Sequence, residues 1–476
     1  MGVLHPWYWR SHPLSGRSGS TIFAALFADQ EIATLLESPA SPPRAQHRYS
    51  ICAGRPRQMG GQPRLWTPAL GKILPCLEQL LQMGHQNIDQ QTHYPSVPPD
   101  LPFVGGWLGW LGYDLAWEIE DLPRLKTDSL PFPVAFWYEP ENFAVLDHQE
   151  QVLWLATTQA EQMDHLEERL ASPSKVQAPP PYFQLTDIHF LTTQTEYEAI
   201  VQRALQHIQA GEIYQANLST RFKVTAEIDP WQLYQTLQTI NPSPFASYWK
   251  TPWGSVVSAS PERLVALQAG QAQTRPIAGT RPRGLTPTQD QAFAQALLQN
   301  TKEIAEHIML VDLERNDLGR VCEWGSVAVN EFLVLEYYSH VMHLVSNILG
   351  TLKPTCSAVD LIRSVFPGGT ITGCPKVRCM EIIEALEPYK RSLFYGSCGY
   401  LDCRGHLDLN ILIRTLLITS GAPAAQPLTP HPSLVPSIIW GQVGAGIVAD
   451  SNPEQEWLES LQKAKAQVSA IQTLAG

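Results

Sequence analysis

The sequence predicts an α+β protein in which antiparallel sheets are flanked by helices. Short apolar segments, such as residues 51–53 and 152–155, are typical of strands. Longer segments carry apolar residues at helical spacing. Residues 196–210 show this pattern most clearly, and Gly211 follows at the point where a helix would end. Strands and amphipathic helices in one chain favour sheets that bury one face under helices.

The length and charge of the chain limit its architecture and its partners. A chain of 476 residues predicts two domains or one large, elaborate domain. The formal charge of −12, from 45 acidic and 33 basic residues, argues against a nucleic-acid partner and against an anionic membrane surface, since both require a basic face. Any anion-binding site must therefore be local, and be built from a few arginines and lysines or a bound cation.

Cysteine spacing and hydropathy predict a reduced, cytoplasmic protein. The eight cysteines form no CxxC pair, and no histidine pair has zinc-finger spacing, so we expect mostly buried free thiols. The first 20 residues contain no continuous apolar stretch, which predicts that there is no signal peptide. The longest apolar stretch, residues 437–449, is too short to span a bilayer.

The remaining elements follow in chain order. Helices are expected at residues 22–26 and 70–81, and a charged helix at 161–170 precedes a proline-rich linker at 172–181. Beyond the linker we expect strands at 213–224, 394–401, 408–417 and 438–448, and helices at 290–310, 377–386 and 453–471. Residues 421–436 are expected to be an exposed insertion in a hairpin. The chain is thereby divided into regions 1–175 and 185–474.

Two helical segments carry closely spaced carboxylates. Glu303 and Glu306 lie three residues apart and project from nearly one face, and Glu456, Glu459 and Lys463 repeat the arrangement. Two such faces that meet across a cleft would suit Mg²⁺, which is held by one or two carboxylates and leaves positions for a substrate. For either pair alone, a solvated helix face is the alternative interpretation.

Glycine-rich turns and an arginine-rich segment could bind anions. Residues 366–376 form a glycine-rich turn that opens a helix, and residues 441–447 form a second place where small residues admit a ligand to the backbone. Lys376 is not placed as a phosphate loop requires, so a carboxylate is the better ligand, and a packed glycine strand is the alternative for the second segment. The arginines of residues 275–284 indicate either a dianionic substrate or internal salt bridges.

Several separate motifs occur together in a fixed order. They are PIAGT at 276–280, ExxEHIMLVDLERND at 303–317, GTITGCPK at 369–376, IRT at 413–415 and GAGIVADS at 444–451. In this order they resemble the chorismate-utilising enzymes, which comprise anthranilate, aminodeoxychorismate, isochorismate and salicylate synthases. The weaker segments LLES at 35–38 and FVGGWLG at 103–109 extend the resemblance into the N-terminal third.

The resemblance implies a fold and a domain organisation. The expected fold is a sandwich of two large antiparallel sheets flanked by helices, like that of anthranilate synthase component I. Residues 1–175 would be the N-terminal region of such a protein. Residues 185–474 would be its chorismate-binding catalytic domain.

The resemblance also implies the site residues. Glu306 and Glu459 would bind Mg²⁺, with Glu303 and Glu456 supporting the ion through water and Lys463 nearby. The ring carboxylate of chorismate would then lie on the metal. The enolpyruvyl carboxylate would be bound by the side chains and backbone N–H groups of Arg414, Tyr395, Gly444, Ala445 and Gly446. The pocket would be lined by Gly279, Thr280 and Thr370, and His343 would face the departing C4 hydroxyl as a general acid.

Two positions bear on the nucleophile. Family members that add water carry a lysine where this chain has Gln215, and a glutamine can hydrogen-bond ammonia but cannot deprotonate water. The resemblance therefore implies amination. Aminodeoxychorismate synthases typically carry a nucleophilic lysine where this chain has Ala278, which favours direct attack of ammonia on C2, loss of pyruvate and formation of anthranilate. The segments 214–218, 260–263 and 368–373 look more like the para-aminobenzoate branch, so aminodeoxychorismate remains the alternative product.

Regulation and partners follow from the same comparison. Ser38 of the LLES segment fits a tryptophan feedback pocket, whereas residues 241–248 depart from the second segment of that pocket; Ser38 capping a turn is the alternative. None of the cysteines sits in a glycine-flanked nucleophile elbow, so a separate glutamine amidotransferase subunit, component II, is expected to supply ammonia. The alternatives from other classes are a non-catalytic regulatory relative that binds an aromatic metabolite and an unrelated metal-dependent hydrolase.

Overall fold

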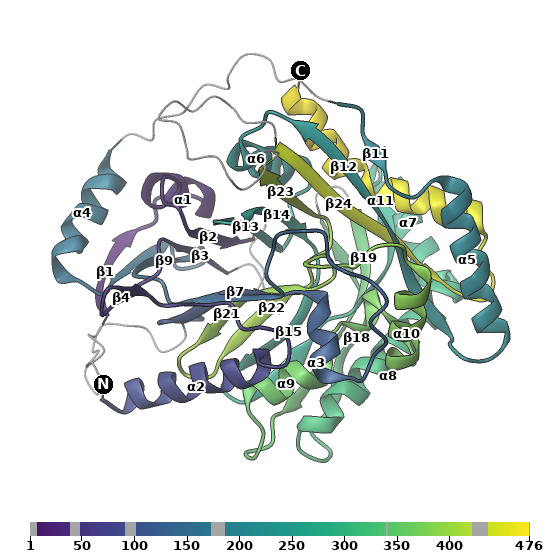
Figure 1. Ribbon diagram of the computed structural model, residues 1–476, viewed down its shortest axis with the longest axis horizontal. Coiled ribbons are helices and arrows are strands. Elements are labelled where there is room, and N and C mark those ends of the chain that lie inside the picture. Colours follow the sequence, from purple (N-terminus) through teal and green to yellow (C-terminus); the bar gives the residue numbers. More distant parts are fainter. Residues whose placement is uncertain are drawn as a thin grey trace.

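Two large antiparallel sheets form a sandwich flanked by helices (Figure 1), which confirms the predicted fold class. The computed structural model describes residues 7–38, 48–90, 101–172, 186–338, 341–420 and 437–475. The two sheets share one hydrophobic core. Trp110 of the smaller sheet and Trp249 of the larger one meet in this core with ring centroids 5.8 Å apart and an edge-on geometry.

The larger sheet has twelve strands. Its order is β1 (Tyr8–Pro13), β10 (Val152–Thr157), β9 (Asn142–Asp147), β3 (Tyr49–Ala53), β2 (Ala33–Glu37), β13 (Phe245–Thr251), β14 (Gly254–Ser260), β23 (Thr415–Ser420), β24 (Ser437–Ile447), β12 (Gln215–Ala226) and β11 (His189–Phe190). The short strand β20 (Gly373–Cys374) pairs with the start of β12. This pairing brings the glycine-rich turn to the end of β12 where Gln215 lies.

The smaller sheet has ten strands. Its order is β17 (Ile277–Pro282), β19 (Val341–Thr351), β16 (Gln271–Thr274), β15 (Arg263–Gln268), β22 (Leu407–Asn410), β21 (Ser397–Asp402), β7 (Gly106–Leu111), β8 (Ala135–Tyr138) and β6 (Leu65–Trp66), and β18 (Ala328–Tyr337) pairs with β19. A separate hairpin is formed by β4 (Gln58–Met59) and β5 (Gln62–Pro63).

Strands from the two ends of the chain alternate within both sheets. In the larger sheet β2 pairs with β13, and in the smaller sheet β7 pairs with β21. Both sheets are therefore continuous across the two regions that the sequence suggests. The linker predicted at 172–181 lies almost wholly outside the described residues, as does the insertion at 421–436. The division into two regions stays a prediction.

Helices cover the outer faces of the sandwich. Against the larger sheet lie α1 (Gly19–Leu26), α4 (Ala160–Ala171), α5 (Gln194–Gln209), α6 (Pro230–Ile240) and α11 (Pro453–Ala475). Near the smaller sheet lie α2 (Ile73–Gln90), α7 (Pro287–Gln299), α8 (Thr301–Val321) and α9 (Ala358–Val365); α3 (Ala116–Ile119) and α10 (Lys376–Leu386) connect other elements. In Figure 1, α5 and α11 lie side by side and α11 packs against β24.

Three predicted elements differ from the structure. The helix expected at 290–310 is broken into α7 and α8, because the Asn300 side chain accepts hydrogen bonds from the N–H groups of Lys302 and Glu303 and starts a new helix. The strand expected at 408–417 is two strands, β22 and β23, which belong to different sheets. The strand expected at 394–401 begins only at Ser397, because Tyr395 adopts a left-handed backbone conformation with φ of 64°.

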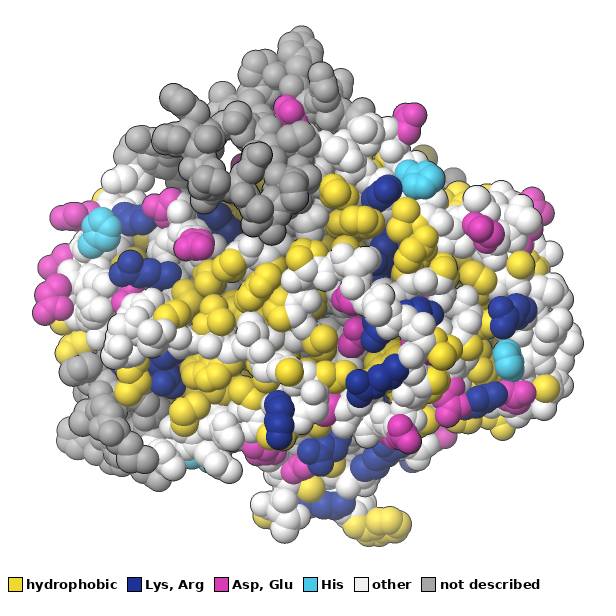
Figure 2. Space-filling model, viewed as in Figure 1, with side chains coloured by type: hydrophobic (Ala, Val, Ile, Leu, Met, Phe, Trp, Pro, Cys, Tyr) yellow, Lys and Arg dark blue, Asp and Glu magenta, His cyan; other side chains and the backbone are white. Residues whose placement is uncertain are grey.

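Other expectations are confirmed. All eight cysteines are free and are buried or half-buried. In the described part of the chain, no helix is both long and apolar enough to cross a membrane. On the face shown in Figure 2, the Lys and Arg side chains that are described lie scattered among acidic and apolar ones, as expected from the negative charge of the chain.

Candidate active site

Four elements bring predicted site residues together: β12, α8, β24 and α11. Gln215, the first residue of β12, donates from Nε2 to Oε1 of Glu306 on α8 at 2.7 Å. On α11, Lys463 donates from Nζ to the carbonyl oxygen of Gly444 at 3.0 Å and lies 2.9 Å from Oε1 of Glu459. The nucleophile position, two predicted metal carboxylates and the glycine strand therefore share one region.

The close approach of two side chains explains why residue 446 of β24 is a glycine. Gly446 pairs with Asn217 on β12, and a Cβ at Gly446 would lie 2.6 Å from Nε2 of Gln215 and 3.4 Å from Oε1 of Glu306. Glycine is required there for the amide and the carboxylate to lie over the backbone. Strand β23 pairs with β24 only from residue 437 to residue 441. Within the described chain, no strand pairs with that edge of β24 beyond Gly441, which leaves backbone groups for a ligand.

Negative charge accumulates at the ends of α8 and α11. Burial raises the pKa of Glu306, and the nearby carboxylate of Glu459 adds to the effect, although Gln215 and Lys463 oppose it. Burial likewise raises the pKa of Glu456, again with a contribution from Glu459. A divalent cation would relieve this repulsion. Among the described residues, no three acidic, His or Cys side chains enclose a metal site. Carboxylate oxygens are ligands of the kind that Mg²⁺ accepts, since this ion is usually held by one or two carboxylates and keeps several waters.

Glu303 pairs with an arginine and lies against β17. Its Oε1 forms a salt bridge of 2.7 Å with Arg281, and its Oε2 lies against the backbone of Gly279, where a Cβ would collide with it. Gly279 has a φ of +60° and sits at a bulge between β17 and β19. The structure thus places Glu303 beside the pocket wall at Gly279, and a role through water at the metal stays a prediction.

His343 lies in the pocket next to Thr280. Its Nδ1 is 2.9 Å from Oγ1 of Thr280, and it shares a small pocket with Arg414, Pro261 and Tyr338. Burial, with a contribution from the positive charge of Arg414, lowers the pKa of His343 to about 4. At neutral pH the imidazole is therefore uncharged.

Both residues predicted to bind the enolpyruvyl carboxylate have unusual backbones. Tyr395 and Arg414 adopt left-handed conformations, with φ of 64° and 49°. Such strain in non-glycine residues clusters at functional sites. The N–H of Tyr395 donates to the carbonyl of Leu412 at 2.9 Å, which brings the two residues into one structural unit. The Tyr395 hydroxyl is buried and forms no hydrogen bond of normal geometry within the described chain.

A further buried acid, Glu262, was not among the predicted site residues. Burial raises the pKa of Glu262 to about 7, although Thr370, Lys463 and Arg414 act in the opposite direction. These three neighbours are all predicted site residues, so Glu262 belongs to the same site. The segment SPER at 260–263 was noted in the sequence, but a lone glutamate gives no sign of burial before the fold is known.

Two cationic features of the sequence have structural roles. In the arginine-rich segment, Arg275 pairs with Glu336, Arg281 with Glu303 and Arg283 with Asp290 at 2.6–2.8 Å. These contacts favour the salt-bridge interpretation.

Lys376 of the glycine-rich turn is engaged in the same way. Its Nζ lies 2.6 Å from Oδ2 of Asp317 and donates to the carbonyl of Val365 at 2.9 Å. Lys376 therefore fixes the turn to α8 and α9.

Ser38, predicted to belong to a tryptophan pocket, is buried, and its hydroxyl has no hydrogen-bond partner among the described residues. The adjacent Glu37 accepts hydrogen bonds from the N–H of Ser20 at 3.0 Å and from the hydroxyl of Tyr234 at 2.9 Å. Asn241, the first residue of the second pocket segment, accepts a hydrogen bond from Arg414 at 3.4 Å. The effector pocket stays a prediction.

A surface groove of about 860 Å³ between α1 and α4 contains none of the predicted site residues. Several predicted site residues lie instead where β12, β24, α8 and α11 meet. The Gln215 amide, Glu306 and Glu459 lie at this junction, and the buried Glu262 is near Lys463 and Arg414. Such a combination of groups suits the binding of an acidic small molecule.

Comparison with known proteins specifies the class. Residues 38–469 match the family model described as chorismate binding enzyme, and the chain belongs to this family. It is 58% identical over 481 residues to an anthranilate synthase component I-like protein of Synechocystis, covering 99% of this chain and 93% of that protein. It is 44% identical to aminodeoxychorismate synthase component 1 of Bacillus subtilis, covering 78% and 77% of the two chains.

The solved structures agree with this assignment. The crystal structure of anthranilate synthase component I from Streptococcus pneumoniae superimposes with a TM-score of 0.72 at 30% identity, covering 90% of this chain and 93% of that one. The protein is thus a chorismate-utilising enzyme of the anthranilate and aminodeoxychorismate synthase group.

Proposed function

We propose that this protein catalyses the Mg²⁺-dependent amination of chorismate with ammonia, and that the products are anthranilate and pyruvate. The observation that carries the proposal is the hydrogen bond of 2.7 Å between the Gln215 amide and Glu306. The buried Oε1 of Gln215 has no hydrogen-bond partner among the described residues. This oxygen can therefore accept a hydrogen bond from ammonia and hold it. The amide cannot act as the base that activation of water requires.

The acidic residues fit the proposed cation. Glu306 and Glu459 would hold Mg²⁺, and Glu303 and Glu456 would support it through water. A bound Mg²⁺ supplies positive charge to the ring carboxylate of the substrate. Arg414 and the Tyr395 hydroxyl would bind the second carboxylate. With both carboxylates neutralised, an acidic protein can accept a dianion.

Loss of the C4 hydroxyl requires a proton. Glu262 has a pKa of about 7 and is half protonated at neutral pH, which suits a general acid. His343, with a pKa near 4, is neutral there. We therefore assign the proton donation to Glu262. His343, hydrogen-bonded to Thr280, would orient the departing hydroxyl.

The product depends on Ala278. This residue is buried on β17 and offers no amine at the position where aminodeoxychorismate synthases typically carry a nucleophilic lysine. Ammonia would attack C2 directly, and the 2-amino intermediate would lose pyruvate. Anthranilate would place the protein in tryptophan biosynthesis. The second candidate, aminodeoxychorismate for folate biosynthesis, is favoured by the similarity to the Bacillus subtilis protein and by the segments 260–263 and 368–373.

The relatives are named component I or component 1, which supports a partner that supplies ammonia from glutamine. We infer that this partner is a glutamine amidotransferase subunit, component II. We further infer that the complex works in the cytoplasm, in keeping with the free cysteines.

The test is direct. The pure protein would be incubated with chorismate, Mg²⁺ and ammonium, and the product identified by mass and by fluorescence. Anthranilate and pyruvate in equal amounts are expected. Aminodeoxychorismate without pyruvate would establish the second candidate, isochorismate would contradict the role of Gln215, and no conversion would contradict the enzyme assignment.

A further inference from the structure

A buried ion pair follows α10 and lies directly behind the site. Arg391 donates from Nε and Nη2 to the two carboxylate oxygens of Glu387 at 3.0 and 2.7 Å. Only 1% of the Arg391 side chain and 2% of the Glu387 side chain are exposed. Burying two charges this completely is costly unless hydrogen bonds satisfy every group. The remaining contacts of the pair show what it does.

The guanidinium joins two segments that form the site. Its Nη1 donates to the carbonyl of Ile371 in the glycine-rich turn, and its Nη2 donates to the carbonyl of Asn217 on β12, both at 2.7 Å. Asn217 lies two residues after Gln215, and Ile371 follows Thr370. Arg391 therefore fixes the strand that carries the nucleophile position to the turn that lines the pocket.

Two tyrosine rings enclose the same guanidinium. Its central carbon lies 4.7 Å from the ring centroid of Tyr113 and 4.6 Å from that of Tyr395. A guanidinium over an aromatic face is held by the ring quadrupole, most strongly where water is excluded. Tyr395 also has a left-handed backbone and a buried hydroxyl without a hydrogen bond of normal geometry within the described chain. Arg391 is thus one of the groups that hold the Tyr395 ring in place.

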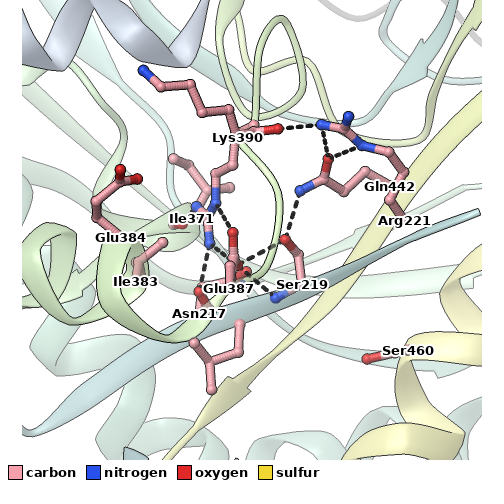
Figure 3. Close-up of polar contacts among 12 residues, drawn as sticks. Asn217, Ser219, Arg221, Ile371, Ile383, Glu384, Glu387, Lys390, Gln442 and Ser460 are labelled. Carbon is pink, nitrogen blue, oxygen red and sulfur yellow. Dashed lines mark hydrogen bonds and ion pairs between the residues drawn. The ribbon is translucent and has the colours of Figure 1, made fainter. Parts of the chain in front are cut away.

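Glu387 extends the support to β24 (Figure 3). It accepts hydrogen bonds from the N–H and the hydroxyl of Ser219 on β12, both at 2.8 Å. The Ser219 hydroxyl in turn accepts from Nε2 of Gln442 at 2.7 Å, and Oε1 of Gln442 accepts from Arg221. Gln442 lies two residues before Gly444, so the chain of contacts reaches the glycine strand of the site.

We propose that Arg391 is a positioning residue for the substrate: it holds the Tyr395 ring so that the buried Tyr395 hydroxyl meets a carboxylate of chorismate. The inference rests on the proposed function, because it needs chorismate in the cleft. Arg391 itself is screened from the substrate by its own partners. Its effect on the bound carboxylate is therefore indirect, and Tyr395 is the partner of Arg391 that is predicted to contact that carboxylate. A purely structural ion pair would change the folded fraction of the enzyme and leave the KM of the folded part unaltered.

A double-mutant cycle distinguishes the two roles. Steady-state kinetics with saturating Mg²⁺ and ammonium would be measured for Arg391→Lys, Tyr395→Phe and the double variant. Each single variant is expected to raise the KM for chorismate about tenfold, with kcat changed less than about threefold. The double variant is expected to have a KM within about twofold of the worse single variant. KM increases that multiply in the double variant, or a folded Arg391→Lys enzyme with an unchanged KM, would overturn the proposal.

Matched controls separate stability from positioning. Arg57 forms another buried ion pair, with Glu139 at 2.7 Å in the N-terminal region, and Arg57→Lys should lower thermal stability without changing KM. If Arg391→Lys does not fold, Glu387→Gln is tested instead. It keeps the side-chain shape and the three contacts to Oε1, loses the contact from Arg391 Nε to Oε2, and should raise KM about threefold. An unchanged KM would contradict the proposal. Turnover by the wild-type enzyme is measured first, so that failure of the proposed function is recognised independently of Arg391.

Discussion

At the scale of single residues, burial sets the protonation states of Glu262 and His343, which both lie near the charge of Arg414. Burial disfavours the charged form of each group, so that it raises the pKa of the carboxyl and lowers that of the imidazole. The two values, about 7 and about 4, leave one neutral acid and one neutral imidazole together just below pH 7. The site can therefore donate a proton without carrying a fixed positive charge on His343.

This assignment predicts a pH dependence. With free ammonia held constant and Mg²⁺ saturating, kcat/KM should fall as the pH rises through about 7, because the active form is the protonated Glu262. Well above pH 7, kcat/KM should fall about tenfold for each further pH unit. In the Glu262→Gln variant, kcat/KM should be lower by about a hundredfold or more and should no longer fall as the pH rises through 7. If kcat/KM of that variant still fell at the same pH and with the same slope, another group would be the proton donor.

The metal hypothesis predicts the effect of neutralising single carboxylates. Glu306→Gln and Glu459→Gln each remove a ligand charge from a polar cleft and little packing, so both should fold and lose Mg²⁺-dependent turnover by about a hundredfold or more. Circular dichroism would check the fold, and activity would be titrated with Mg²⁺. The control is Glu454→Gln, which alters an exposed residue of α11, the helix of Glu459. This variant should have normal Mg²⁺-dependent activity. Near-normal activity of either site variant would remove that residue from the metal site.

A glycine substitution tests the geometry around Gln215. Gly446→Ala would place a Cβ 2.6 Å from the Gln215 amide, which must then move away from Glu306. We expect kcat/KM to fall about tenfold or more while the protein remains folded. As a control, Gly319→Ala on α8 meets nothing within 4 Å and should raise the free energy of unfolding by about 0.5–1 kcal/mol with normal activity. Full activity of Gly446→Ala would show that the amide position is unimportant.

Some residues could be placed from the sequence and others could not. Glu306, Arg414 and His343 stand in ordered motifs and were predicted. Arg391 and Glu387 are four residues apart, a spacing that usually indicates an exposed pair on a helix. Nothing local shows that strands β12 and β24 and two tyrosines will enclose this pair, because those neighbours are distant in the chain.

At the scale of elements, the junction of α7 and α8 determines where the metal carboxylates project. Both helices carry apolar residues at helical spacing, so the pattern alone predicts one helix across Asn300. The break depends on one side chain that caps the second helix. The segment between β22 and β23 was mispredicted in the same way. Residues 411–413 are apolar enough to continue a strand, but the chain passes here from the smaller sheet to the larger one, and Arg414 lies at this crossing.

The cap at Asn300 can be tested. Asn300→Ala should lower the free energy of unfolding by about 1 kcal/mol, since two N–H groups lose their acceptor. Because Glu303 and Glu306 lie in the first two turns of α8, the variant should also need more Mg²⁺ for half-maximal activity. Asn300→Asp keeps an acceptor and should restore both properties. Equal denaturation midpoints for the wild-type and Ala variants would show that the cap is not stabilising.

At the scale of the whole molecule, two sheets of twelve and ten strands place residues from distant parts of the chain in one site. Sequence patterns predicted only a minority of the strands, and the sandwich was predicted through family resemblance. The strand order was not predicted, because pairings such as β7 with β21 depend on contacts between segments that share no local signal.

The nitrogen source is a property of the whole chain. The eight cysteines are free, and burial raises the pKa values of seven of them, which is the opposite of what a glutaminase nucleophile requires. The isolated protein should therefore aminate chorismate from ammonium at alkaline pH and not from glutamine. Product formation with each nitrogen source would be compared, with and without an added amidotransferase subunit. Glutamine-dependent activity of the contaminant-free chain would contradict the need for a partner.

The pairing of β7 with β21 affects how this protein is made. Ribosomes add roughly 5–20 residues per second, so β7, complete at Leu111, waits on the order of 15–60 s until Asp402 at the end of β21 has been synthesised. During that interval β7 has only β8 beside it, and one apolar edge of a nascent hairpin is open to neighbouring chains. A chaperone that binds the nascent chain after β8 and before β21 has been synthesised would therefore increase the yield of folded enzyme more than one that binds after the chain has left the ribosome.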